Sequence, residues 1–421
     1  MHSPKVNVVF HRGAKEIGGN CIEIESQGIR ILLDIGKPLV KEGQSAPDMS
    51  GVIQKGSQYD AVFISHAHSD HFGLLAHLDS NTPIYCSQAT FDLLAIHYRW
   101  REKSRLPVNS FHTFQTEQVV KIRNPNHRAE MEVIPFLVDH SAFDAHGFVV
   151  RANGKVLVYS GDFRNHGRKG NIYRRVLSLL DDRPVDLLMM EGTNLGRPAQ
   201  YVQSEWSVEK RLCTSFQQTA GLIGVTFSMQ NVDRFVSVYC AALQSKRKLV
   251  IDLYSAVVLE AVSRYTPIPG PTAANIEVWL PANQYVAPAW STAHLRKKIR
   301  PTAQLLDDIR QTPGKYVVLV RDSMMHELRS LRFSVHIYSL WRGYADSPKT
   351  ESMRHVMQQT GCRWEFIHTS GHATRACILQ FLKDVPARNL RIIHSEGVHA
   401  DYANLLALYS DFAWRGETFS C

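Results

Sequence analysis

Three histidines and an aspartate lie within six positions of the stretch FISHAHSDHFG, directly after an apolar segment. Imidazole nitrogens and carboxylate oxygens are the natural ligands of zinc-like divalent metal ions. His66 and His68 are two residues apart, so on an extended loop they can face the same side, while Asp70 and His71 turn toward an adjacent position. One tetrahedral ion that keeps a position open for water cannot readily use all four. The stretch therefore predicts two ions that share a bridging group.

Other apolar runs in the N-terminal half also end in a polar residue, as buried strands with functional ends do. The polar residues at these ends are Asp34, His66, His140, Asp162 and Glu191. Functional groups commonly collect on the loops at one edge of a sheet, where a rigid scaffold aims them. We expect His140, Asp162 and the more distant His394 to supply the further histidines and the bridging carboxylate. Asp34 is ambiguous, and we do not expect it to bind metal.

The sequence pattern changes near residue 200. Helical spacing at 206–219 and 232–245 alternates with strand-like runs at 247–253 and 315–322, which is typical of a parallel sheet with crossover helices. From about residue 350 the chain returns to strands that end in histidines. We therefore predict an α/β protein in which one domain, 1–196 and 351–421, is interrupted by another, 197–350.

The composition is that of a globular protein with a basic charge. Hydrophobic residues make up 44% of the 421 residues, and the formal net charge of +9 favours an anionic partner such as nucleic acid. The seven cysteines are scattered without a CxxC pair, which indicates free thiols in a reducing compartment. No segment approaches the ~18 apolar residues that a membrane-spanning helix needs. We expect a soluble, cytoplasmic protein.

The motifs in this order resemble those of the metallo-β-lactamase superfamily. Asp34, the HAHSDH stretch, His140 and Asp162 resemble its first four motifs. The segments MEGTNLG, HTSGHA and IIHSEG resemble the three additional motifs of the β-CASP nucleases, which include RNase J and the 3′-end-processing endonuclease of the polyadenylation machinery. Glu191, His372 and His394 stand at the diagnostic positions of these segments.

This resemblance implies an αββα sandwich with an inserted β-CASP α/β domain, and it also implies how the ligands are shared. One ion would be held by His66, His68 and His140, and the second by Asp70, His71 and His394, with Asp162 as the bridge between them. The ions would most readily be Zn²⁺, with Mn²⁺ as the alternative. The resemblance also implies a short form of the family without a C-terminal domain or KH domains.

The implied activity is that of a metal-dependent ribonuclease, endonucleolytic or 5′-exonucleolytic, that leaves 5′-phosphate and 3′-hydroxyl ends. Asp70 and Asp162 would serve the metal-activated hydroxide, and His372, supported by Glu191, would protonate the leaving oxygen. RNA-processing members resemble this chain in having a histidine at the position of His394, which favours single-stranded RNA as the partner. A DNA-directed or mixed-specificity nuclease and a non-catalytic RNA-processing scaffold are the alternatives, and homo-oligomerisation stays open.

Two further groups of residues are predicted to contact the substrate. The small residues of HTSGHA allow close approach of a phosphate to backbone N–H groups. The predicted phosphate-binding residues are His368, Ser370, Gly371 and Ala373. The predicted contacts to the nucleic-acid backbone are Arg164, Arg168 and Lys169 of FRNHGRKG and Arg234 of FSMQNVDR.

Overall fold

The computed structural model describes residues 5–39, 58–124, 129–196, 202–284, 295–396 and 418–420. The chain divides into two compact units. The first comprises Met1–Leu94, Arg105–Tyr201 and Gly371–Cys421, and the second comprises Ala95–Ser104 and Val202–Ser370. None of the helices in the described ranges is both long and apolar enough to cross a membrane.

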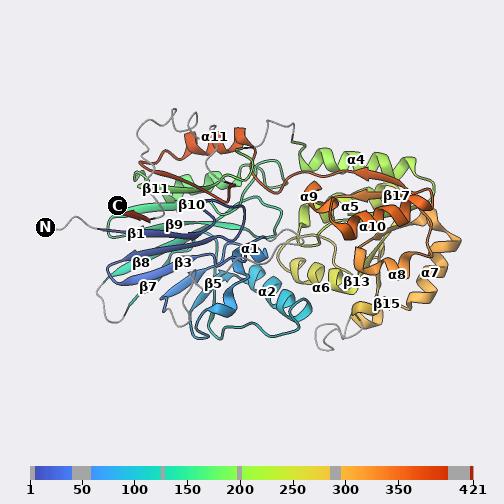
Figure 1. Cartoon of the computed structure of the whole chain (residues 1–421), viewed down its shortest axis with the longest axis horizontal. Helices are drawn as coiled ribbons and strands as arrows, with labels where there is room; N and C mark the ends of the chain where they lie inside the picture. Colours follow the sequence, from blue (N-terminus) through green and yellow to red (C-terminus); the bar gives the residue numbers. More distant parts are fainter. Residues whose placement is uncertain are drawn as a thin grey trace. The chain divides into compact units, whose positions relative to one another are not determined.

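The first unit contains a seven-stranded sheet in the order β20-β1-β2-β3-β4-β5-β6 (Figure 1). Its strands are β1 (Asn7–Arg12), β2 (Cys21–Ser26), β3 (Ile29–Leu33), β4 (Ala61–Phe63), β5 (Ile84–Ser87), β6 (Phe111–Phe114) and β20 (Thr418–Ser420). The pairs from β20 to β3 are antiparallel, and those from β3 to β6 are parallel. The β2–β3 hairpin closes through Gln27 and Gly28, both with the positive φ that a type I′ turn requires.

A second, six-stranded sheet of this unit has the order β19-β11-β10-β9-β8-β7. Its strands are β7 (Val120–Arg123), β8 (Glu130–Leu137), β9 (His146–Ala152), β10 (Lys155–Tyr159), β11 (Leu187–Glu191) and β19 (Leu390–Ile393). The strands β10, β11 and β19 run parallel to one another. Their carboxyl ends therefore lie at one edge of the sheet, and three of the predicted site residues follow these ends.

The two sheets of the first unit pack face to face, and helices cover the outside. Apolar side chains of both sheets share one core, in which the rings of Phe63 and Phe148 meet edge to face with centroids 5.6 Å apart. The other face of the second sheet packs against α11 through side chains such as Phe381. This arrangement is the predicted αββα sandwich. The helices of this unit are α1 (Ser69–Phe72), α3 (Val176–Leu179) and α11 (Arg375–Asp384). Its 3₁₀ turns are η1 (Leu75–His77) and η2 (Ile172–Arg175). The helix α2 (Gln88–Trp100) begins in the first unit, and its residues from Ala95 on belong to the second.

The second unit has a seven-stranded parallel sheet in the order β15-β14-β13-β16-β12-β17-β18, as the alternating pattern predicted. Its strands are β12 (Leu222–Thr226), β13 (Lys248–Asp252), β14 (Ile276–Trp279), β15 (Ile299–Arg300), β16 (Tyr316–Leu319), β17 (Phe333–Tyr338) and β18 (Arg363–Phe366). Its helices are α4 (Glu205–Gln218), α5 (Val232–Gln244), α6 (Leu253–Val262), α7 (Thr302–Gln311), α8 (Met325–Leu328), α9 (Arg342–Ala345) and α10 (Pro348–Gln359). Short 3₁₀ turns occur at η3 (Ala282–Gln284), η5 (Leu295–Lys298), η6 (Pro313–Lys315) and η7 (Asp322–Met324).

Polar residues fix where the longer helices of this unit begin. Ser204, Asn231, Asp252 and Ser347 each accept a hydrogen bond from a backbone N–H in the first turn of the helix that follows.

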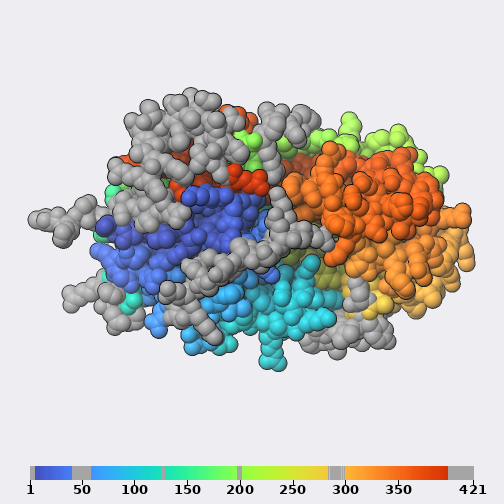
Figure 2. Space-filling model, viewed as in Figure 1, coloured from blue at the N-terminus to red at the C-terminus, as the bar shows by residue number. Residues whose placement is uncertain are grey.

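The orange surface in Figure 2 belongs to the later part of this unit, which includes α9 and α10. The unit extends to Ser370 rather than ending at 350, because β18 pairs with β17 and belongs to the same sheet.

Candidate metal centre

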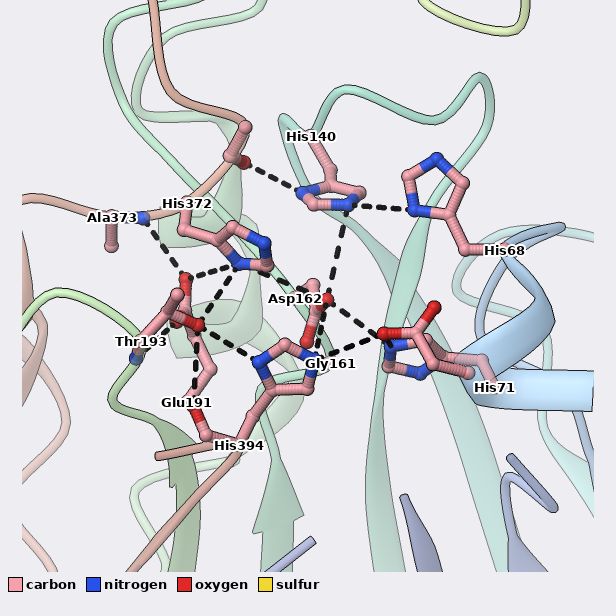
Figure 3. Close-up of polar contacts among 12 residues, drawn as sticks. His68, His71, His140, Gly161, Asp162, Glu191, Thr193, His372, Ala373 and His394 are labelled. Atoms are coloured by element: carbon pink, nitrogen blue, oxygen red, sulfur yellow. Dashed lines mark hydrogen bonds and ion pairs between the residues drawn. The ribbon is translucent and has the colours of Figure 1, made fainter. Parts of the chain in front are cut away.

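Three of the predicted histidine ligands meet at one point of the first unit. His66 and His68 follow β4, and His140 follows β8. His68 Nδ1 lies 3.1 Å from His66 Nε2 and 3.3 Å from His140 Nε2, and the rings of His68 and His140, which lie side by side in Figure 3, meet edge to face. His66 and His140 are buried. All three nitrogens lie within 4.8 Å of one another, which is the spacing of a shared ion.

The hydrogen bonds around this trio determine which nitrogen atoms carry lone pairs. His140 Nδ1 donates to the carbonyl oxygen of Gly371 at 2.6 Å. Ser65 Oγ donates its proton to Asp34, so it can only accept from His66 Nδ1, which is 3.0 Å away. Both rings therefore present an unprotonated Nε2 toward His68. Two imidazole lone pairs that converge on His68 Nδ1 fit a divalent cation held by the three rings.

A second group of predicted ligands lies beside the trio. Asp70 and His71 belong to α1, Asp162 follows β10, and His394 follows β19. His71 Nε2 is 3.1 Å from Asp162 Oδ2, and His394 Nε2 is 3.3 Å from Asp70 Oδ2. All four residues are buried, and their ligand atoms also lie within 4.8 Å of one another. The chemistry of this set, two imidazoles and two carboxylates, suits Zn²⁺ or Mn²⁺.

Asp162 lies between the two groups. Its Oδ2 is 3.1 Å from His71, 3.5 Å from His394 and 3.9 Å from His140. Its Oδ1 is buried, and no residue in the described part of the chain gives it a hydrogen bond. Burial alone raises the pKa of this carboxyl, but the imidazoles of His394 and His71 hold the pKa of Asp162 well below its usual range. A buried carboxylate with one uncommitted oxygen fits a ligand shared by two cations, as a bridging role requires.

Asp34, which the sequence left ambiguous, supports the site without belonging to either ligand group. It ends β3 with a positive φ of 59°, which turns its carboxylate toward the loop after β4. This buried carboxylate accepts hydrogen bonds from Ser65 N at 2.7 Å, Ser65 Oγ at 2.8 Å and His71 Nδ1 at 2.7 Å. Tyr159 Oη also donates to it, at 2.5 Å. Asp34 therefore fixes the tautomer in which His71 presents Nε2. The sequence analysis did not single out Ser65 or Tyr159.

The loop after β3 holds the segment of the predicted ligands Asp70 and His71 through its backbone. Ile35 N donates to His71 O, and Lys37 N donates to Ser69 O. A Cβ on Gly36 would lie only 1.7 Å from the carbonyl oxygen of Asp70, so no other residue fits there without moving α1. The glycine in the stretch LLDIG is the signal in the sequence for this close approach.

Glu191 and His372 lie next to the ligand groups, as Figure 3 shows. The buried Glu191 carboxylate accepts hydrogen bonds from Ala373 N at 2.9 Å and Thr193 N at 3.0 Å, and its Oε1 is 3.5 Å from His372 Nδ1. The side chain of His372 keeps 23% of its surface exposed. Burial lowers the pKa of this imidazole, but Glu191 and Asp162 together raise the pKa of His372 above its ordinary value.

The predicted phosphate-binding loop is only in part available to a phosphate. The Ala373 N–H already donates to Glu191, so it is not free for a substrate anion. Gly371 uses its carbonyl oxygen for His140, and a Cβ there would lie 2.3 Å from Ser141 Oγ. His368 and Ser370 belong to the second unit, and Gly371 and Ala373 to the first. The role of the four residues as a phosphate pocket stays a prediction.

The predicted backbone contacts divide into buried and partly exposed residues. Arg164 is fully buried and pairs with Asp139 at 3.0 Å, and Arg234 is fully buried and pairs with Glu205 at 2.7 Å. Both guanidinium groups are committed to carboxylates inside the protein, so the predicted surface role of these two residues is wrong. The last two residues of the prediction, Arg168 and Lys169, are half-buried.

Comparison with known proteins agrees with this geometry. Residues 30–206 match the family model of the beta-lactamase superfamily domain. The chain is 28% identical over 218 residues to an RNase J-like protein of Methanocaldococcus jannaschii, covering 50% of this chain and 48% of that protein. It is 24% identical over 251 residues to ribonuclease J of Helicobacter pylori, covering 57% of this chain and 35% of the relative.

A shorter match to one further relative and a similar solved structure complete the comparison. A segment of 94 residues, 22% of the chain, is 31% identical to 15% of the transcription termination factor FttA of M. jannaschii. The chain thus spans about half the length, or less, of the curated relatives it matches. A crystal structure of a protein of unknown function from Enterococcus faecalis V583 superposes with a TM-score of 0.76 at 19% identity, covering 99% of both chains, which shows a shared fold.

Proposed function

We propose that this chain is a metal-dependent ribonuclease of the β-CASP family that hydrolyses phosphodiester bonds of single-stranded RNA and leaves 5′-phosphate and 3′-hydroxyl ends. The observation that carries the proposal is the position of Asp162: its Oδ2 lies between two converging ligand groups, and its buried Oδ1 has no hydrogen-bond partner among the described residues. The relatives named ribonuclease J support RNA as the substrate. We assign the second unit to the inserted β-CASP domain of the family.

His66, His68 and His140 would hold one divalent ion, and Asp70, His71 and His394 the other, with Asp162 shared. Two such ions supply an activated water and stabilise the charge that develops on the phosphate. Imidazole and carboxylate ligands are compatible with Zn²⁺ or Mn²⁺. The protein's own contribution is to hold each ring in the tautomer that leaves the ligating nitrogen unprotonated, through Ser65, Asp34 and Gly371.

The departing 3′-oxygen needs a proton when the P–O bond breaks, and we assign its donation to His372. This imidazole is partly exposed, whereas His66, His71, His140 and His394 are buried. Glu191 stabilises the protonated form through its negative charge, 3.5 Å from Nδ1. Because the same carboxylate accepts two backbone N–H groups, it cannot rotate away from His372 without breaking those bonds.

The test compares purified wild-type protein with the variants His68→Ala, Asp162→Asn and His372→Ala on labelled single-stranded RNA and on DNA of the same sequence. We expect the first two variants to lose bound metal and RNA cleavage together. We expect His372→Ala to keep its metal and to lose most of its turnover. His77→Ala removes an exposed histidine of the same unit and serves as the matched control.

Further measurements test the product ends, the substrate and the mode of cleavage. Ligation of the products without prior phosphorylation would show 5′-phosphate ends. Cleavage of RNA by Asp162→Asn at the wild-type rate would refute the binuclear mechanism, and loss of metal from His372→Ala would make that residue a ligand. Faster cleavage of the DNA would replace RNA by DNA as the substrate. Circular and 5′-triphosphate RNAs separate internal cleavage from 5′-exonucleolytic cleavage.

A further inference from the structure

The hydroxyl group of Thr193 lies between two imidazoles of the site (Figure 3). Its Oγ1 is 2.8 Å from His394 Nδ1 and 3.2 Å from His372 Nδ1. It is also 3.2 Å from the carbonyl oxygen of His394, to which it donates. Thr193 itself is only 6% exposed. The Thr193 hydroxyl thus contacts His394 of the second ligand group twice, at the ring and at the carbonyl oxygen. It also contacts His372, the proposed proton donor, once.

The proton count of the hydroxyl determines the tautomer of His394. A threonine hydroxyl has one proton and two lone pairs. Since the proton goes to the His394 carbonyl oxygen, the oxygen accepts from His394 Nδ1–H. Nε2, which faces Asp70 at 3.3 Å and Asp162 at 3.5 Å, is then free to bind a cation. The second lone pair of the hydroxyl faces His372 Nδ1.

The backbone of His394 explains why this imidazole needs such support. His394 ends β19 with a φ of 52°, in the left-handed region that is unfavourable for a residue with a Cβ. Its N–H donates to the carbonyl oxygen of Gly13 at 2.6 Å. The Thr193 hydroxyl binds the carbonyl oxygen and the ring of the same residue, so it acts on both the backbone turn and the ring orientation.

Thr193 is itself held by contacts that do not depend on a metal. Its N–H donates to Glu191 Oε2 at 3.0 Å. The preceding Gly192 donates to the carbonyl oxygen of Ile393 at 2.8 Å, and a Cβ on Gly192 would lie 2.4 Å from the side chain of Ile392. The segment after β11 therefore fits closely against the end of β19, and the hydroxyl is in place before any ion binds.

We propose that Thr193 is a positioning residue of the metal centre. Its hydroxyl selects the Nδ1–H tautomer of His394 and holds this ring in the orientation that the second ion requires, and the same hydroxyl contacts the ring of His372. The inference rests on the proposed function, because it takes the group of Asp70, His71, Asp162 and His394 as a metal site. It does not depend on which nucleic acid is cleaved.

The test removes the hydroxyl without changing the shape of the side chain. Thr193→Val is nearly isosteric and lacks the oxygen, whereas Thr193→Ser keeps it. Thr90→Val is the matched control, because Thr90 is a fully buried threonine of the same unit whose Oγ1 has no hydrogen-bond partner among the described residues. The readouts are the number of ions per chain after dialysis against limiting Zn²⁺, measured by mass spectrometry, and the absorption of Co²⁺ as it is titrated into the protein.

Wild type, Thr193→Ser and Thr90→Val should bind two ions with similar affinities. Thr193→Val should bind one ion normally and the other at least about tenfold more weakly, the loss typical of removing a hydrogen-bond partner of a ligand. Two ions bound to Thr193→Val at wild-type affinity would overturn the inference. Should Thr193→Val fail to fold, Thr193→Ala lacks the same oxygen with a smaller side chain, and the same two outcomes apply to it.

The metal readout separates this inference from the proposed ribonuclease activity. If wild-type protein cleaves no RNA but Thr193→Val loses one ion, the positioning role holds and the proposed function fails. If wild type cleaves RNA and Thr193→Val keeps both ions, the function holds and the positioning role fails. In an active enzyme we also expect Thr193→Val to lower kcat more than it changes KM, with recovery in Thr193→Ser.

Discussion

The substitution His336→Gln should make the second unit more resistant to acid. His336 lies in β17 and is fully buried, and burial lowers its pKa from the ordinary 6.5 to about 3. The unfolded chain therefore binds one more proton than the folded chain between these two pH values. Stability falls as the pH falls below 6.5, and the loss is complete at about pH 3. Above pH 6.5 His336 is mostly neutral in both the folded and the unfolded chain, so it adds almost nothing to the pH dependence of stability.

The contacts of this histidine explain why it stays neutral. Thr226 Oγ1 donates to the carbonyl oxygen of Val320, so it accepts from His336 Nε2–H at 3.1 Å. Nδ1 is buried with no hydrogen-bond partner among the described residues. A Cβ on Gly224 would lie 2.6 Å from this nitrogen, which shows how little space surrounds it. Protonation would place a charge in this buried position, and no carboxylate contributes to the pKa of the imidazole.

Linkage converts this pKa difference into a magnitude. One pKa unit corresponds to about 1.4 kcal/mol, so the full penalty is about 5 kcal/mol, of which about 2 kcal/mol is present at about pH 5. Glutamine keeps an N–H donor for Thr226 and cannot be protonated. The difference in unfolding free energy between His336→Gln and wild type should therefore rise by about 2 kcal/mol between about pH 7.5 and 5.

Urea unfolding followed by circular dichroism at several pH values measures this difference directly. His326→Gln, an exposed histidine of the same unit, is the control and should follow wild type at every pH. Every carboxylate is present in both proteins, so the comparison isolates the effect of residue 336. A difference between His336→Gln and wild type that stays flat from about pH 7.5 to 5 would refute the reasoning, because it would mean that a buried, partnerless nitrogen accepts a proton at little cost.

Three further substitutions test other parts of the structure. Asp34→Asn should weaken Zn²⁺ binding about 10- to 100-fold in a competition titration against a chelator, because His71 loses its carboxylate partner, and unchanged affinity would contradict the assigned support. Glu205→Gln leaves the buried Arg234 without its counter-charge and should lower the unfolding free energy in urea by about 3 kcal/mol, so a change below about 1 kcal/mol would argue against the ion pair. Gly36→Ala should lower the melting temperature and metal content together; wild-type values for both would show that the close approach at α1 can relax.

The candidate ligands could be predicted because they follow strand ends, whereas their division into two groups came from the family resemblance. The sequence marks each end as an apolar run followed by a histidine or a carboxylate. Once β10, β11 and β19 pair in parallel, their carboxyl ends share an edge, and Asp162, Glu191 and His394 are brought together without further information. The local sequence pattern was sufficient here because the pairing of the strands brings residues that are distant in the sequence to one edge of the sheet.

The supporting residues could not be predicted in this way. Tyr159 donates to Asp34 across 125 positions of sequence, and neither residue carries a local signal for the other. Arg234 stands in a segment that suggests a surface contact, but its burial depends on Glu205, which is 29 positions earlier and on another helix. Such pairs form through tertiary packing. The spacing of residues within a motif predicts only which side chains lie at the end of one strand.

The partners of the ligating imidazoles make the two halves of the metal centre unequal. In the first group, His66 and His140 donate to neutral acceptors, the hydroxyl of Ser65 and a carbonyl oxygen. In the second group, His71 donates to the carboxylate of Asp34, and His394 to a threonine hydroxyl. A carboxylate partner raises the basicity of the imidazole. Both partners in the second group, Asp34 and Thr193, are side chains that a single substitution removes. Backbone carbonyl support, as at His140, cannot be removed in this way. Substitutions at Thr193 should therefore weaken the second ion and leave the first ion bound. Substitutions at Asp34 should weaken the second ion directly through His71, and they should also affect the first ion through Ser65, which donates to Asp34 and accepts from His66.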